Sequence, residues 1–483
     1  MEDDTFPAGL LGTYYSSRHD HGLYRSCGVS SHYTFTPSTS NPLEEFTQHL
    51  SRALAKTIKR HPPLCYGLLP ASKPSGLPAR FKRLPQISWK DIISITHSSE
   101  PPTPSTQETR ISEEIGLAHS QLFDDPEHKP IWRLRVLIFR AENGVCSIYI
   151  LFITHHAIAD GLSCASFQRT LHEQLCLAAA KTDEQSSVSW PYIVPEDVGR
   201  PIAIEDAMVI RPAGCKVFAL SGAPEDAQGG KLWAGNPPCM PTIASYRSLA
   251  LLVTVPAERV RGIVDMSRRL GITVTGYLHG LVVGFLARAA VTDHQLSIKA
   301  GTPYSLRPFS KLPISEMANH VSSLTTEWDA ALLARMRDVE EGSPEEEELL
   351  SAIGKRFSTE LSTELANIHD DGVGLLRVVE NIPDLDVYCR EGLLRERAET
   401  YEISNLGMVR MNAVPAQTAF KLEALIFSQC GMVTGAPIGC SVVNVEGGPL
   451  VITLAWQEGG VADEIMVGLQ GFLRGRLGGW STG

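Results

Sequence analysis

The amino-acid sequence predicts a mixed fold of the α/β (α+β) class, built on mixed sheets. Runs rich in β-branched and aromatic residues are typical of strands, and stretches with apolar residues at helical spacing are typical of helices. These two kinds of element follow one another without strict alternation, which favours mixed sheets. The chain of 483 residues is long enough for two lobes, each with its own core.

The first part of the chain contains a predicted hairpin. Two apolar runs flank Asn143-Gly144, and this dipeptide is a strong signal for a tight hairpin turn. The elements expected here are a strand at residues 27–35, a helix at 42–59, surface connections at 69–78 and 97–106, and hairpin strands at 131–139 and 145–154.

A proline-rich stretch follows, with eight prolines between residues 182 and 241, and it predicts a long crossover. Beyond it, Ser343 and Glu346 form a capping-box pattern, and we interpret the acidic run 345–348 as a solvated helix start. The later elements expected are strands at 249–255, 299–307, 399–411 and 420–430, helices at 256–270 and 275–290, a hairpin across 446–449 and a last helix around 465–473.

Composition excludes several classes of protein. A net charge of −11 argues against nucleic acid as a partner, because a phosphate backbone needs a basic surface. The N-terminal residues lack a signal-peptide pattern, and no apolar run reaches the ~20 residues that span a bilayer. Ten scattered cysteines without C-x-x-C spacing fit reduced thiols. We therefore expect a cytoplasmic monomer without a transmembrane segment.

The candidate active site lies where a buried strand meets a helix. The strand 145–154 runs into His155-His156-Ala157-Ile158-Ala159-Asp160-Gly161, and apolar residues at helical spacing follow. Such a junction holds polar side chains on rigid backbone at the edge of a core, where their pKa values are shifted. Two imidazoles and a carboxylate at this point predict acid–base chemistry.

This His-His-x-x-x-Asp-Gly motif resembles the signature of the chloramphenicol acetyltransferase-like superfamily, which includes CoA-dependent acyltransferases and condensation domains. Within it, the chain is most similar to the fungal alcohol acetyltransferases. The residues that carry this closer similarity are Tyr14, Arg18-His19, Gly22-Leu23-Tyr24-Arg25, Tyr33, Trp233-Ala234-Gly235 and Ser404-Asn405-Leu406-Gly407. The Asp-Phe-Gly-Trp-Gly segment of plant relatives is absent from the sequence.

The resemblance implies two lobes with a tunnel between them. We place an N-terminal lobe at residues 1–183, the crossover at 184–247 and a C-terminal lobe at 248–483. It also implies that His156 is the general base, whereas His155 faces the other way from the strand end and is structural. Asp160 would pair with Arg307, away from the substrate. Gly161 would allow either a close backbone approach or an unusual φ.

The same resemblance places Ser404, Asn405 and Gly407 along the tunnel, as substrate- or cofactor-binding residues; a plain turn beside a strand is the alternative. The reaction implied is direct transfer of an acetyl group from acetyl-CoA to a small-molecule alcohol, with no permanently bound cofactor and no metal. A secondary-metabolite hydroxyl is the favoured acceptor. A base must take the hydroxyl proton, and histidine suits this role because its reference pKa is near ~6.5.

Four other readings remain open. Gly161-Leu162-Ser163-Cys164-Ala165 nearly matches a hydrolase elbow, although Ser163 is expected inside the helix. His155 and Asp160 have the spacing of glycerolipid acyltransferases, whose apolar segments the chain lacks. His156 and Asp160 have no evident third metal ligand. A condensation-like enzyme would act on an amine or a carrier-bound substrate, or the chain would belong to the non-acetylating members of the fold.

Overall fold

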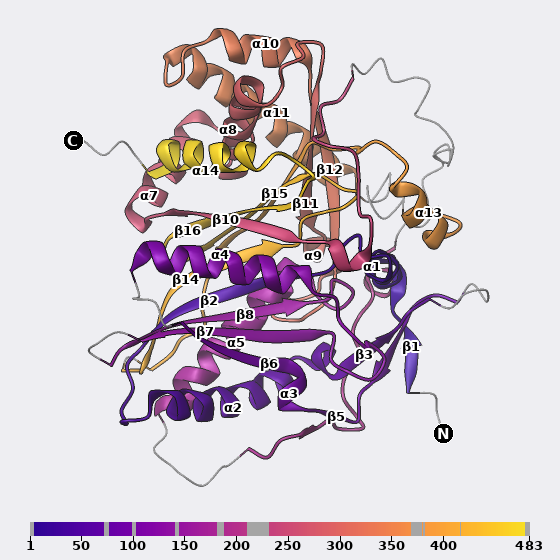
Figure 1. Ribbon diagram of the computed structural model, residues 1–483, viewed down its shortest axis with the longest axis vertical. Helices are drawn as coiled ribbons and strands as arrows, with labels where there is room; N and C mark the ends of the chain where they lie inside the picture. Colours follow the sequence, from indigo (N-terminus) through magenta and orange to yellow (C-terminus); the bar gives the residue numbers. More distant parts are fainter. Residues whose placement is uncertain are drawn as a thin grey trace.

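Two large sheets, each covered by helices, make up the computed structural model (Figure 1). It describes residues 4–71, 77–98, 103–140, 144–180, 188–209, 231–368, 379, 382–415 and 417–478. The first sheet has five strands in the order β14-β2-β8-β7-β6, and the second has six in the order β10-β16-β15-β13-β11-β12. Parallel and antiparallel pairs occur in both sheets. The predicted mixed α/β architecture is therefore confirmed.

The five-stranded sheet carries both strands of the predicted hairpin, whose turn residue Asn143 lies outside the described residues. β7 (Trp132–Arg140) and β8 (Cys146–Thr154) pair antiparallel, and β8 is buried along almost its whole length. β2 (Cys27–Phe35) lies on the other side of β8 and matches its predicted bounds. At the far edge β6 (Ile93–Ser98) runs parallel to β7. Apolar strands with few polar positions are expected in such a sheet, because it is covered on both faces.

One part of the sequence was misread as a surface connection. The stretch 97–106 includes the end of β6 and the start of α4 (Pro104–Ser120). α4 begins there because Thr103 Oγ1 accepts a hydrogen bond from the Thr106 amide at 3.2 Å, which caps the helix. Proline at the first helical position, which we interpreted as a loop signal, is favourable in a helix start.

The six-stranded sheet contains five strands near their predicted positions. These are β10 (Ser248–Val255), β11 (Ile298–Ser305), β13 (Tyr401–Val409), β15 (Ile438–Val445) and β16 (Leu450–Gln457). The sixth strand, β12 (Val321–Trp328), was not predicted. β11 ends at Ser305, earlier than the predicted 307, because Arg307 is the first residue of a short helix, α9 (Arg307–Ser310).

Helices cover the outer faces of both sheets and also lie between them. α2 (Pro42–Arg60) and α5 (Gly161–Ala180) pack on the five-stranded sheet, and α4 lies between the two sheets, against β10 and β8 (Figure 1). The six-stranded sheet is covered by α7 (Ala257–Leu270), α8 (Val274–Ala289), α11 (Pro344–Asn367) and α14 (Asp463–Gly478). In the described part of the chain no single helix is long and apolar enough to cross a bilayer, and α7 with α8 reaches that length only as a pair bent by 93°.

The remaining elements are short or lie near the edges. They are β1 (Thr5–Pro7), β3 (Tyr66–Leu69), β4 (Arg80–Arg83), β5 (Gln86–Ile87), β9 (Tyr192–Ile193), α1 (Gly9–Asp20), α3 (Trp89–Ile92), α6 (Ile204–Ala207), α10 (Ala330–Asp338), α13 (Leu385–Gly392) and the 3-10 turns η1 (Pro62–Cys65) and η2 (Ile243–Ser245). Of these, α1 and α13 help to form the site described below.

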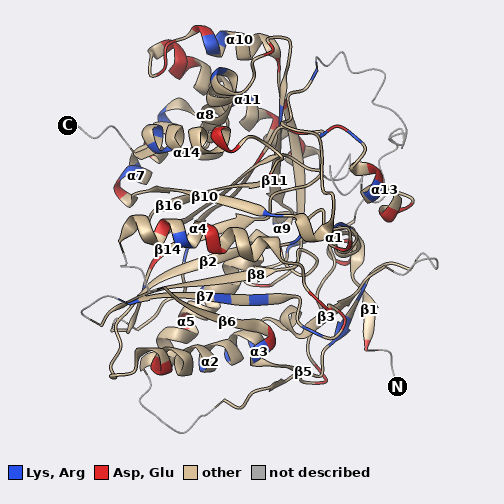
Figure 2. Ribbon diagram, viewed as in Figure 1, with Lys and Arg blue, Asp and Glu red and all other residues tan. Residues whose placement is uncertain are grey.

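The acidic start of α11 is not fully solvated, which corrects the sequence interpretation. Ser343 caps the helix as predicted, because its Oγ accepts from the Glu346 amide at 3.1 Å. The Glu346 carboxylate, however, is buried and binds Arg288 at 2.8 Å and Arg476 at 2.6 Å. This acidic side chain therefore ties α11 to α8 and α14, whereas its neighbours in the run face solvent. Figure 2 shows charged residues on the peripheral helices α7, α10 and α13, and also on α4 and β7.

β14 (Phe420–Gln429) links the two halves of the molecule. It belongs to the late part of the chain, yet it pairs antiparallel with β2 at the edge of the five-stranded sheet. Side chains from β14 thus reach the space between the sheets alongside those from β13. The same space receives the loop that follows β8, so residues separated by more than 200 positions in the sequence meet there.

Candidate active site

The His-His loop is anchored at both ends by backbone hydrogen bonds. β8 ends at Thr154, and the His155 amide then donates to the carbonyl of Ile131 at 2.9 Å. At the other end the Asp160 amide donates to the carbonyl of Ala318 at 3.1 Å, and α5 begins at Gly161. This confirms the predicted strand-to-helix junction. The loop is fixed to the segment before β12, which belongs to the other sheet.

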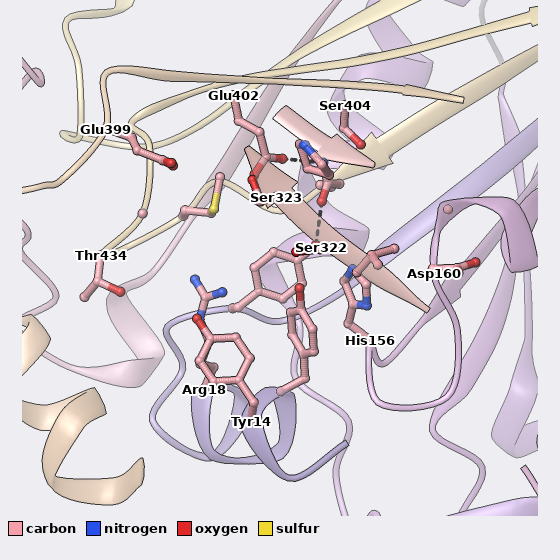
Figure 3. Close-up of a pocket in the computed structure, with 18 of the residues that line it drawn as sticks. Tyr14, Arg18, His156, Asp160, Ser322, Ser323, Glu399, Glu402, Ser404 and Thr434 are labelled. Carbon is pink, nitrogen blue, oxygen red and sulfur yellow. Dashed lines mark hydrogen bonds between the residues drawn. The ribbon is translucent and has the colours of Figure 1, made fainter. Parts of the chain in front are cut away.

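His156 lines a cavity of about 500 Å³ between the two sheets (Figure 3). Its side chain is buried, and its ring stacks on that of Tyr15 with centroids 4.0 Å apart and planes 7° from parallel. The Asn319 amide nitrogen lies 2.7 Å from the His156 carbonyl oxygen and 3.0 Å from its Nδ1. Among the described residues no hydrogen-bond partner is found for Nε2. This nitrogen is therefore the one available to a substrate.

Burial keeps the His156 imidazole neutral. Removal from water lowers the pKa of His156 to about 4, and this outweighs a hydrogen bond to its own carbonyl group and the nearby charge of Asp160, which both act in the opposite direction. A neutral imidazole at physiological pH has a free lone pair and can accept a proton. The geometry and charge state of His156 thus meet the requirements for a general base.

His155 points away from the cavity, as the sequence analysis expected. It is fully buried, and its Nδ1 accepts a hydrogen bond from the Ala157 amide at 3.0 Å. Its ring packs against His19 at a centroid distance of 4.6 Å and near Phe123. These contacts hold the His155 ring outside the cavity.

Asp160 and Arg307 form a buried ion pair between the two halves of the molecule. Arg307 Nη2 lies 3.1 and 3.2 Å from the two carboxylate oxygens of Asp160. Burial alone would raise the pKa of Asp160, but Arg307 and the hydrogen bonds from Ser163 and His320 hold it below its usual value. Arg307 also donates to the carbonyls of Pro313, Glu316 and Ala318, so its charge is held by several partners.

The Ser163 hydroxyl is hydrogen-bonded to both members of the ion pair, and it is not positioned to act as a nucleophile. Its hydroxyl lies 2.8 Å from Asp160 Oδ1 and 2.7 Å from the Ala318 carbonyl, and it accepts from Arg307 at 2.9 Å. The side chain is fully buried within α5 and does not line the cavity. This geometry disfavours the serine hydrolase reading.

Gly161 is packed closely by side chains of β13 and β14, and not by a neighbouring backbone. A Cβ at this position would lie 2.6 Å from Leu406 and 3.1 Å from Phe427. A Cβ here would require the tips of the Leu406 and Phe427 side chains to shift. The backbone angle φ of Gly161 is not positive, so conformational freedom does not account for the glycine.

The predicted residues of the late segment divide into two groups. Ser404 and Asn405 line the cavity from β13. Gly407 does not: it has a φ of +71° and lies in an irregular turn within the strand, where its amide donates to Asn405 Oδ1 at 2.8 Å. Ser404 and Asn405 are thus placed where a ligand could reach them, whereas Gly407 fits the turn interpretation.

Several cavity residues were missed or unassigned in the sequence. Asn319 contacts the candidate base, and Arg18, Glu399 and Glu402 bring charge to the cavity (Figure 3). In the sequence, Arg18 stood out only because it belongs to a segment that resembles the family. No local sequence pattern indicated that Glu399 or Glu402 would face a cavity. Among the described residues no group of three or more His, Cys, Asp or Glu side chains is placed to hold a metal ion.

We predict that stability falls as the pH is lowered from about 6.5 towards 4. Burial lowers the pKa of many histidines in the folded protein, among them His32, His61, His119, His156, His172 and His279. Above pH ~6.5 these groups are neutral in both states; below it only the unfolded chain takes up protons, which favours unfolding.

Glu402 acts in the opposite direction, since burial raises its pKa to about 7, but the histidines outnumber it. Urea denaturation at a series of pH values measures the balance. The prediction would be contradicted if the free energy of unfolding stayed constant or rose as the pH was lowered from 7 to 5.

Comparison with known proteins finds relatives that match nearly the whole chain. A family model described as alcohol acetyltransferase matches residues 112–467. A probable alcohol acetyltransferase of Aspergillus fumigatus, crmB, is 24% identical over 468 residues, which are 95% of this chain and 96% of that protein. A probable alcohol acetyltransferase of Fusarium pseudograminearum, FCK4, is 24% identical over 489 residues, with coverage of 96% and 92%.

Solved structures share the fold at low sequence identity. A trichothecene 15-O-acetyltransferase from Fusarium sporotrichioides, TRI3, superimposes with a TM-score of 0.66 at 12% identity, covering 96% of this chain and 93% of that chain. TRI101 of F. sporotrichioides, solved with coenzyme A and T-2, superimposes with a TM-score of 0.58 at 10% identity, covering 96% of this chain and 97% of that chain. The first condensation domain of the CDA synthetase superimposes with a TM-score of 0.57 at 14% identity, covering 97% of this chain and 94% of that chain.

Proposed function

The chain belongs to the alcohol acetyltransferase family, and we propose that it transfers an acetyl group from acetyl-CoA directly to a hydroxyl of a small-molecule acceptor. The observation that carries this proposal is His156: a neutral, buried imidazole that lines the cavity and whose Nε2 has no partner among the described residues. Two relatives with names of the same activity match nearly the whole chain. A secondary-metabolite alcohol is our preferred acceptor class.

In this mechanism His156 Nε2 takes the proton of the acceptor hydroxyl as its oxygen attacks the thioester carbonyl. The base is needed because an alcohol is a poor nucleophile at neutral pH. The tetrahedral intermediate then collapses, and the sulfur of CoA leaves with the proton that the imidazole holds. The stack on Tyr15 holds the plane of the ring, and Asn319, which donates to the His156 carbonyl oxygen, holds the backbone of the loop.

Ser404 lies across the cavity from the base (Figure 3), and Asn405 lines the same cavity. Both are our proposed contacts to substrate or acyl donor. The Ser404 hydroxyl has no partner among the described residues, so it is free to donate to a carbonyl oxygen that gains charge. Asn405 is held by Thr275, to which its amide donates at 3.0 Å. Asp160 and Arg307 fix the loop and take no part in proton transfer.

The proposed function is tested with the purified protein and isotopically labelled acetyl-CoA. Candidate alcohols and amines are screened, and products are identified by mass spectrometry. A parallel reaction supplies the acetyl group on an acyl-carrier protein. Transfer from acetyl-CoA to a hydroxyl supports the proposal. Transfer only from the carrier protein, or only to amines, would replace it with a condensation-like reaction.

Direct transfer also predicts that no acyl-enzyme accumulates. Ser163 and Cys164 are both fully buried, and the Ser163 hydroxyl is already bonded to the ion pair. Incubation with acetyl-CoA alone should therefore leave the intact mass unchanged, and two-substrate kinetics should follow a sequential pattern. An acetyl adduct that forms and decays at the turnover rate would contradict direct transfer.

A further inference from the structure

A cluster of charged side chains faces the same cavity as the base. Arg18 comes from α1, Glu402 from β13 and Glu399 from the segment just before it. Figure 3 shows all three pointing into one space, beside Tyr14. Each is half-buried, because its exposed surface lies inside the cavity. The catalytic step described above uses none of them.

The guanidinium of Arg18 contacts aromatic rings but no carboxylate. It lies 5.4 Å from the ring centre of Tyr14 and 5.0 Å from that of Tyr24. Within the described residues no acidic oxygen is found within 4.0 Å of Arg18, and no hydrogen-bond acceptor is found for it. By contrast Arg395, which also lines the cavity, is paired with Glu391.

The two carboxylates are each held at one oxygen. Glu399 Oε1 accepts from Thr325 at 3.0 Å, and Glu402 Oε1 accepts from Gln429 at 3.0 Å. Neither Oε2 has a hydrogen-bond partner in the described part of the chain. A Cβ at Gly301 would lie 2.7 Å from Glu399 Oε2, so glycine leaves room for this carboxylate.

Two tyrosine hydroxyls in this region also lack partners. The side chains of Tyr14 and Tyr15 are only 8% and 7% exposed, and both line the cavity. Among the described residues neither hydroxyl has a hydrogen-bond partner. Because both residues line the cavity, their hydroxyls are available to a ligand bound there. Together with Arg18 and the glutamates, they form a set of donors and acceptors that a ligand would complete.

The signs of the charges restrict the ligand. Burial raises the pKa of Glu402 to about 7 and also raises that of Glu399, so the two carboxyl groups do not outweigh the single positive charge of Arg18. Neither a cationic amine nor an anion is therefore favoured by the cluster as a whole. A hydroxyl group both donates and accepts, so it can donate to Glu402 while it accepts from Arg18. The tyrosine rings add apolar faces for the carbon skeleton.

The cluster is also close enough to the base for one small molecule to reach both. The Tyr24 ring lies 5.5 Å from that of His156, and its hydroxyl donates to Gln429 at 2.8 Å. Gln429 in turn donates to Glu402. Two hydrogen-bonded side chains therefore connect the neighbourhood of the base to the carboxylate.

We propose that the acceptor is a neutral, hydroxyl-rich molecule, such as a polyol or a sugar-like compound, and that Arg18, Glu399 and Glu402 bind the hydroxyls that are not acetylated. This inference rests on the proposed function. It narrows the acceptor class, and it assigns a specificity site distinct from the catalytic histidine.

The experiment compares acceptors of equal chain length. Hexanol, hexanediol, hexanetriol and sorbitol form a series of increasing hydroxyl number; aminohexanol and hydroxyhexanoate add a charge of either sign. The value of kcat/KM with acetyl-CoA is measured for each. We expect it to rise along the series, by about 10- to 100-fold overall, because each bond to a charged group is worth about one factor of ten. The value of kcat/KM for each of the two charged acceptors should be lower than that for hexanediol.

Variants link the preference to the cluster. In Glu402→Gln and Arg18→Met the ratio of kcat/KM for sorbitol to that for hexanol should fall by about tenfold. Exposed controls of the same chemistry, Glu464→Gln on α14 and Arg261→Met on α7, should keep the wild-type ratio. Circular dichroism and thermal midpoints check that each variant is folded.

The outcomes separate this inference from the proposed function. If no alcohol accepts an acetyl group, the proposed function fails, and with it the basis for the inference. If alcohols are acetylated but hexanol equals sorbitol, or a charged acceptor is preferred, the inference alone is overturned. The inference is also overturned if folded Glu402→Gln and Arg18→Met variants keep the wild-type ratio of kcat/KM for sorbitol to that for hexanol.

Discussion

Replacing His156 with alanine is expected to lower kcat by about 10²- to 10⁴-fold, the range typical for loss of a general base. The neutral imidazole supplies the lone pair that accepts the hydroxyl proton, and among the described residues that line the cavity it is the only imidazole. Steady-state kinetics with acetyl-CoA and an accepted alcohol measure the effect. Because the proton acceptor is lost and not the binding surface, KM should change much less than kcat.

His155 provides the matched control for this experiment. It is the adjacent histidine, it is also buried, and it contacts His19 and Phe123 instead of the cavity. We expect His155→Ala to lower the denaturation midpoint while kcat falls by much less than in His156→Ala. Near-normal turnover by a folded His156→Ala protein would remove His156 from the mechanism. Equal losses of kcat in both variants would mean that the substitutions disrupt the whole loop, so that the effect could not be assigned to the His156 imidazole.

The local features of the site could be predicted from the sequence because they depend on neighbouring residues. The strand that ends at Thr154 and the helix that begins at Gly161 each have their own periodicity, and the polar residues between them stand out. The pairing of Asp160 with Arg307 came from resemblance to a family, since 146 positions between them carry no signal of contact.

The rest of the site depends on contacts that no spacing in the sequence reveals. Asn319 reaches the His156 loop from a segment whose strand, β12, was not predicted. Glu402 and Gln429 meet because β14 leaves the second half of the chain to pair with β2. A single glutamate in a strand pattern looks like a solvent-facing residue, and only the tertiary structure shows that its face is turned into a cavity.

The Asp160–Arg307 ion pair is expected to show strong coupling in a double-mutant cycle. Each residue is almost completely buried, with 1% and 5% of its side chain exposed. Removing one partner leaves a buried charge without its counter-charge, which typically costs about 3–5 kcal/mol. Asp160→Asn and Arg307→Met should therefore each lower the free energy of unfolding by this order. Activity should fall with it, because the pair holds the loop that carries His156.

The double variant should be less damaged than the sum of the singles, by at least about 1 kcal/mol, since it contains no orphaned charge. Some loss should remain: Asp160 also accepts from the amides of Ser163 and His320, and Arg307 also donates to three carbonyls. Urea denaturation of the wild type, both singles and the double gives the coupling energy. Lys421→Met with Glu423→Gln, an ion pair in which Lys421 is 75% exposed, provides a control cycle with coupling near zero. Additive effects at Asp160 and Arg307 would show that the two halves of the molecule are held together at this point by the backbone contacts of Ala318, and not by the charges.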